Sequence, residues 1–150
     1  MFRFLPRFLY LSFYLVFATS QAHAVEITDA WMRALPPGQP TAAAYLTLNN
    51  PGDTPVRVVA VSAEFAERAE IHESRQVDGM WRMRRLEALE VPAGGQVALE
   101  PGGAHLMLFG LRQAVRPGDN LNATLELENG DTLAVTITVE SPGGAPHHNH

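Results

Sequence analysis

Short apolar runs separated by turn signals are the feature that most constrains how this chain folds. Clusters of Gly, Pro, Asn and Asp stand at residues 50–53, 92–95, 101–103, 117–120 and 129–131. Such residues favour tight turns, because Gly and Asn tolerate positive φ angles and Pro presets φ. The runs of strand length are residues 25–31, 43–48, 56–61, 96–99, 105–109, 121–127 and 132–139. Without a competing helical period, this spacing predicts an all-β fold: an antiparallel β-sandwich or barrel with Greek-key connections.

The first 24 residues are typical of a signal peptide. Arg3 and Arg7 precede an apolar run at residues 8–19, which is too short to span a bilayer comfortably. Small residues at positions 22 and 24 predict cleavage after Ala24, with Ala22 as a second possible site. A retained membrane anchor is the weaker alternative. We therefore expect an exported protein with a signal peptide at 1–24, one domain at 25–140 and a flexible tail at 141–150.

Charge and cysteine content narrow the function classes. Residues 25–150 carry nine arginines against sixteen acidic residues, a net charge near −7 with neutral histidines. Nucleic acid is therefore an unfavourable partner. The chain has no cysteine, which excludes disulfides and thiol chemistry, so any bound metal must be held by nitrogen, oxygen or thioether ligands.

Four such ligands occur in the order His72, Met83, His105 and Met107. Thioethers favour soft ions and imidazole is a borderline ligand, so two of each favour Cu(I) over zinc, magnesium or calcium. His105 and Met107 are two residues apart in a predicted strand and should point to the same face. Outside the signal peptide and the tail, the chain has no other histidine.

Asp78-Gly79 allows the position of the first ligand pair to be predicted. A two-residue hairpin turn there pairs Val77 with Met80, so that the numbers of cross-strand partners sum to 157. His72 then lies opposite Arg85, and Met83 is its diagonal neighbour on the same face. Diagonal Cβ atoms are about 7 Å apart, a distance that long side chains can bridge to a shared ion.

Ordinary structural roles are the alternatives for each of these residues. His105 or Met107 alone is more typical of a core or rim residue, and His72 of an exposed strand histidine. Met80 and Met83 could fill gaps by packing sulfur against Trp81. A plain β-sandwich interaction module would leave the ligand pattern to chance.

The spacing H-x10-M-x21-H-x-M resembles the ligand pattern of the periplasmic copper chaperones of the PCu(A)C family. The flanking blocks at residues 29–38, 43–48, 70–73, 80–84 and 101–111 are similar to the same family, and together they cover about residues 25–139. One departure is Gln76, where members often carry a further methionine.

The resemblance implies a cupredoxin-like β-sandwich that binds Cu(I) through these four residues, and it implies a chaperone rather than an enzyme. It further implies delivery of copper in the periplasm to the binuclear copper centre of a haem–copper oxidase, in cooperation with thiol-bearing assembly proteins. After cleavage of the signal peptide, no stable membrane insertion is expected.

Two further histidine-based hypotheses concern the ends of the chain. His147, His148 and His150 form a possible secondary Cu(II) site on the predicted tail, or simply a solvated segment. Cleavage after Ala22 would expose His23 as the first residue, whose amino and ring nitrogens can chelate Cu(II) as in copper mono-oxygenases. A copper storage or sequestration protein is the remaining alternative.

Overall fold

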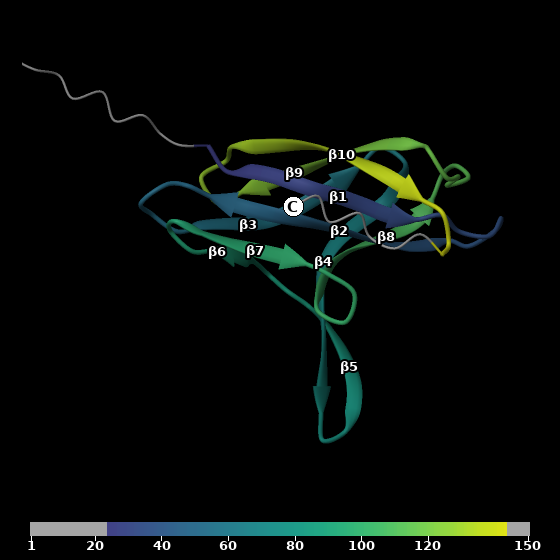
Figure 1. Cartoon of the computed structure of the whole chain (residues 1–150), viewed down its shortest axis with the longest axis horizontal. Helices are drawn as coiled ribbons and strands as arrows, with labels where there is room; N and C mark the ends of the chain where they lie inside the picture. The colour runs from purple at the N-terminus through teal and green to yellow at the C-terminus, as the bar shows by residue number, and fades with distance from the viewer. Residues whose placement is uncertain (1–23, 144–150) are drawn as a thin grey trace, which may run out of the picture.

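Ten strands and no helix make up residues 24–143, the part of the chain that this computed structural model describes (Figure 1). The strands are β1 (Glu26–Arg33), β2 (Thr41–Asn50), β3 (Val56–Ala63), β4 (Ala66–Val77), β5 (Met80–Arg85), β6 (Leu89–Val91), β7 (Gly95–Leu99), β8 (Ala104–Leu111), β9 (Asn120–Leu127) and β10 (Thr132–Glu140). The predicted all-β class is therefore confirmed, and each of the seven predicted runs lies largely within a strand.

The sheet closes on itself. Its strands follow the order β5-β4-β8-β2-β1-β10-β9-β3-β6, and an additional pairing of β4 with β3, at Val61 and Ala69, joins the two arms of this path. Seven strands thus form a ring, and β5, β6 and β7 are added to β4, β3 and β2 respectively. Closure satisfies strand edges that an open sheet would leave unpaired.

One pairing differs from the antiparallel arrangement predicted for the sandwich. β1 and β10 run parallel, with Trp31 opposite Thr138 and Arg33 opposite Glu140. Parallel neighbours cannot be joined by a tight turn and need a long connection. The first and last strands meet this requirement because the whole intervening chain connects them.

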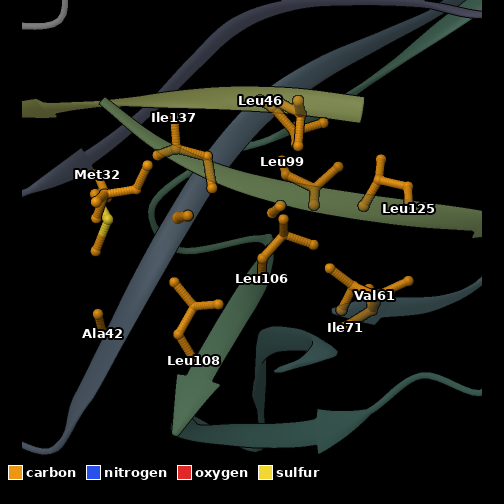
Figure 2. Packing of buried hydrophobic residues seen from close by; sticks show 14 of the residues in the cluster. Met32, Ala42, Leu46, Val61, Ile71, Leu99, Leu106, Leu108, Leu125 and Ile137 are labelled. Atoms are coloured by element: carbon orange, nitrogen blue, oxygen red, sulfur yellow. The ribbon is translucent and has the colours of Figure 1, made fainter. Parts of the chain in front are cut away.

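The core lies inside the ring and is built from alternate residues of each strand. In β2, Ala42, Ala44, Leu46 and Leu48 are buried, whereas the residues between them are only partly buried. Figure 2 shows Leu46, Leu106, Leu108 and Ile137 packed together, and all four are at most 1% exposed. The alternation leaves the opposite face of β2, β8 and β4 outside the core, where it is available for a site.

Hairpins form at the predicted Asp78-Gly79 turn and at the turn signal of residues 129–131, but the two turns differ. Asp78 and Gly79 have φ angles of 51° and 76°, as a two-residue type I′ turn requires, and Val77 pairs with Met80. The loop that joins β9 and β10 is longer. Leu127 accepts a hydrogen bond from Gly130 and donates one to Asp131, so residues 128–130 form a three-residue loop.

The hairpin of β4 and β5 projects from the body of the molecule (Figure 1). Every residue of β5 is exposed, and β5 pairs with β4 at the end of the strand order. The predicted limits of the signal peptide, domain and tail remain predictions, since residues 1–23 and 144–150 lie outside the described part. In that part, no helix has the length and apolar character needed to cross a membrane.

Candidate metal centre

Two histidines face each other across neighbouring strands on the outer face of the sheet. His72 of β4 pairs directly with His105 of β8, and their ring centroids are 6.1 Å apart. Directly opposed residues of an antiparallel pair project to the same face. Their neighbours Ile71 and Leu106 project into the core and are 3% and 1% exposed. The core residues thus fix the two strands that carry the imidazoles.

The two methionines lie on the same face, one on each side of the histidine pair. Met107 is two residues beyond His105 and lies opposite Glu70 of β4. Met83 of β5 lies opposite Ser74, which makes it the diagonal neighbour of His72, and His72 itself lies opposite Arg85. The register predicted from Asp78-Gly79 is therefore confirmed. All four candidate ligands share one face of β5, β4 and β8.

Hydrogen bonds assign the free nitrogen of each imidazole. His72 Nε2 lies 2.8 Å from a carboxylate oxygen of Glu70, and His105 Nδ1 lies 3.1 Å from the carbonyl oxygen of Gly103. Because both partners accept, the neutral rings donate from these nitrogens. The lone pairs available to a metal are then on Nδ1 of His72 and Nε2 of His105.

Nδ1 of His72 is a buried polar atom without a hydrogen-bond partner in the described structure. Buried nitrogens are normally satisfied, so an unpartnered one on a candidate ligand fits a position that a metal ion would fill. His105 is buried as well, with 5% of its surface exposed, whereas Met83 is 53% exposed. The candidate centre is therefore enclosed around the histidines and open at Met83.

Glu70 was not predicted as part of the site. Its carboxylate contacts His72, lies 3.0 Å from Arg68 Nε and 3.8 Å from Arg85 Nη1, and is 14% exposed. The hydrogen bond from His72 lowers the pKa of Glu70 most strongly, and the two arginines lower it further, although partial burial raises it. A sequence signal existed, because Glu70 and His72 alternate on one strand and must share a face.

Aromatic side chains surround the histidines. The ring centroid of His105 is 6.5 Å from that of Tyr45, and the centroid of His72 is 6.0 Å from that of Phe109. Trp31 packs against Tyr45 at 4.7 Å. Burial raises the pKa of the Tyr45 hydroxyl, an effect that Arg33 partly offsets. These rings pack along one side of the candidate centre.

The arrangement favours a soft metal ion. Residues 24–143 contain no cluster of three or more His, Asp or Glu placed to hold a metal, so the imidazoles of this face do not form such a site with carboxylates alone. Two imidazoles with free lone pairs and two thioethers form a ligand set suited to Cu(I).

The structure contradicts two of the ordinary roles considered for these residues. A gap-filling role for Met80 and Met83 is wrong, because 56% and 53% of their surfaces are exposed. His72 is not an exposed strand histidine, since its side chain is only 14% exposed. His23, His147, His148 and His150 lie outside the described residues, so the hypotheses that rest on them remain predictions.

Sequence comparison assigns the chain to a family. The model of the LpqE-like family of putative lipoproteins matches residues 25–139. The chain belongs to the LpqE-like family. A relative from Leifsonia xyli subsp. xyli, named "Putative lipoprotein Lxx21020", is 31% identical over 126 residues, which is 83% of this chain and 75% of the relative.

Solved structures of PCuAC domains share the fold. The CuI form of DR1885 from Deinococcus radiodurans is 33% identical to this LpqE-like chain, covers 84% of it and 85% of its own length, and has a TM-score of 0.66. The apo PCuAC domain of PmoF1 is 26% identical, with coverages of 81% and 97% and a TM-score of 0.68. The predicted resemblance to the PCu(A)C family and the cupredoxin-like β fold are confirmed.

Proposed function

We propose that this LpqE-like protein is a periplasmic copper chaperone that binds one Cu(I) ion through His72, Met83, His105 and Met107. The observation that carries the proposal is the position of two opposed imidazoles and two thioethers on one sheet face, with the lone pair of His72 Nδ1 buried and unpartnered. Copper in the CuI form of DR1885, a solved relative of the same fold, supports the choice of metal.

The proposed task is donation rather than storage or catalysis. Met83 is more than half exposed, so an incoming ligand can displace its thioether before the buried histidine side is disturbed. Without thiolates, the site should hold Cu(I) tightly enough for transport but yield it to an acceptor that offers cysteine thiolates. We propose such an acceptor in the assembly of the binuclear copper centre of a haem–copper oxidase, either an oxidase subunit or a thiol-bearing assembly protein.

Methionine-to-leucine substitutions test the site. Leucine keeps the volume and apolarity of methionine but removes the sulfur lone pair, so Met83→Leu and Met107→Leu should each weaken Cu(I) binding by about tenfold or more, or about 1.4 kcal/mol. The measurement is a competition titration against a Cu(I) chelator. X-ray absorption of the loaded wild type should show both sulfur and nitrogen scatterers.

Met80→Leu is the matched control. Met80 lies on the same hairpin with similar exposure, but it pairs with Val77 on the face opposite to that of Met83. Its substitution should leave Cu(I) affinity unchanged. If all three variants bind Cu(I) with the affinity of the wild type, the thioethers do not bind the metal and the proposal is wrong.

A further inference from the structure

The projecting hairpin carries an unusual surface. We define the arm as residues 75–85, the outer part of β4 together with β5. Within the described residues, four large hydrophobic side chains are exposed, and three of them lie on the arm: Met80, Trp81 and Met83 are 56%, 66% and 53% exposed. The fourth is Val59, at 37%. Trp81 and Met83 share one face of the arm and Met80 lies on the other, so both faces of this narrow hairpin expose apolar side chains. Exposed apolar side chains clustered on one element mark interaction sites more often than solitary ones do.

The arm also contains two arginines placed against each other. Arg75 and Arg82 are directly opposed across the hairpin, where like charges destabilise a strand pair. The neighbouring Arg84 pairs with Glu73 at 2.9 Å, but neither Arg75 nor Arg82 forms an ion pair within the described part of the chain. The repulsion has no internal compensation there, so an external anionic group would relieve it.

Charge is divided sharply between the arm and the body. The arm carries four arginines and one aspartate, a net charge of +3, whereas the other described residues carry five arginines and fifteen acidic residues, a net charge of −10. A partner with an acidic patch would be attracted to the arm and repelled by the body. This distribution favours one docking orientation.

We propose that the arm is the docking surface for an acidic protein partner. Carboxylates of the partner would pair with Arg75 and Arg82, and its apolar side chains would cover Met80 on the same face and reach around the edge strand β5 to Trp81 on the face of Met83. A locally acidic protein fits better than an anionic membrane, because a flat bilayer would also bring negative charge towards the acidic body. Resting on the proposed function, the partner would be the copper acceptor, since a partner that reaches around the open edge of β5 also meets Met83 on the other face.

The first experiment tests docking without copper. The probes are two synthetic peptides of equal length without thiols, one with a cluster of glutamates beside apolar residues and one with glutamines at the same positions. NMR titration at low salt should show saturable shifts of the Trp81 indole signal with the glutamate peptide only. Arg75→Gln/Arg82→Gln should raise the dissociation constant by about tenfold, a change worth about 1.4 kcal/mol.

Arg112→Gln/Arg116→Gln is the matched control. It removes the same number of charges from positions after the end of β8, and neither side chain forms an ion pair within the described residues. This variant should bind the glutamate peptide like the wild type. Equal weakening by both double substitutions, or equal binding of the two peptides, would overturn the docking surface.

Two further measurements exclude other occupants. Arm-dependent cosedimentation with vesicles containing anionic phosphatidylglycerol, without peptide binding, would assign the arm to membranes and overturn the proposal. Arm-dependent self-association in sedimentation velocity, without peptide binding, would assign it to a second copy of this chain and also overturn the proposal.

Copper transfer links docking to the proposed function. The two peptides can also be made with a pair of cysteines as copper acceptors. The wild-type protein should then transfer Cu(I) faster to the glutamate peptide than to the glutamine peptide. Arg75→Gln/Arg82→Gln should abolish this preference while keeping the Cu(I) affinity. If the thiol-free peptide docks but the protein binds no Cu(I), the proposed function fails and the docking surface stands. If Cu(I) is transferred to both peptides at the same rate, the docking surface fails and the proposed function stands.

Discussion

At the scale of single residues, Glu70 decides which nitrogen His72 can offer to a metal. Its carboxylate accepts a hydrogen bond from Nε2 at 2.8 Å, which leaves the lone pair on Nδ1. Carboxylates that orient histidine ligands in this way commonly change metal affinity by about 10- to 100-fold when they are replaced. We therefore assign Glu70 a positioning role rather than a place among the ligands.

A pair of variants tests this role. Glu70→Gln and Glu70→Leu both remove the charge next to Arg68 and Arg85, but only glutamine can still accept the proton of Nε2. Glu70→Leu should weaken Cu(I) binding by about 10- to 100-fold, whereas Glu70→Gln should retain much of the wild-type affinity. Nitrogen NMR of apo protein at pH values above the imidazole range should show the Nε2–H tautomer at His72 in the wild type and Glu70→Gln. Equal affinities for the two variants would contradict the assignment.

The same carboxylate makes stability depend on pH. The pKa of Glu70 is lower in the folded protein than its usual value of 4.5. Its contribution is therefore complete above about pH 4.5 and is lost as the pH falls through the lowered folded pKa. Urea unfolding of the apo protein should show wild type more stable than Glu70→Gln at pH 7, with the difference shrinking in stronger acid. A difference that persists unchanged at strongly acidic pH would contradict this linkage.

At the scale of elements, the hairpin determines which face of the arm carries Met83. Arg82 and Met83 are adjacent and project to opposite faces, opposite Arg75 and Ser74 respectively. The double substitution Arg82→Met/Met83→Arg keeps the composition but moves the thioether to the other face. Cu(I) affinity should fall at least as far as in Met83→Leu, as measured by chelator competition. Wild-type affinity in the exchanged variant would mean that strand facing does not define the site.

The sequence allowed the register of this hairpin to be predicted because the turn chemistry is strict. Asp78 and Gly79 both adopt positive φ angles, so the two-residue turn fixes every partner up to His72 and Arg85. The Asn129-Gly130 signal was weaker. Only Gly130 has a positive φ there, and the side-chain oxygen of Asn129 accepts a hydrogen bond from the Asp131 backbone instead, which forms a longer loop.

The pairing of strands that are far apart in the chain could not be predicted from the sequence pattern. Alternation showed that His105 and Met107 share a face, but only the pairing of β4 with β8 brings His72 opposite His105. That pairing joins segments more than thirty residues apart, and no local signal specifies it. The same reason explains why the parallel pairing of β1 with β10 and the three-residue strand β6 were not predicted.

At the scale of the whole molecule, the closed sheet carries the two histidines and Met107, whereas the arm supplies the exposed Met83. His72 and His105 are held by strands whose inward residues lie in the core, whereas Met83 stands on a hairpin strand that pairs only with β4 within the described sheet. Under the proposed function, an acceptor thiolate would therefore replace Met83 first. This division favours stepwise ligand exchange over release of free copper.

Ligand exchange predicts that the redox state of the acceptor controls transfer. The chain has no cysteine, so it cannot reduce a disulfide of the acceptor, and its thioethers should not hold Cu(I) against two thiolates. Cu(I)-loaded protein mixed with a reduced soluble dicysteine acceptor should lose its metal, whereas the disulfide form of that acceptor should leave it loaded. Separation of the two proteins followed by metal analysis measures the distribution. Deletion in the native host should accordingly lower oxidase activity most when copper is scarce, and added copper should restore much of it. Retention of copper in the presence of the reduced acceptor would instead favour storage, because a donor must bind its cargo less tightly than the protein that receives it.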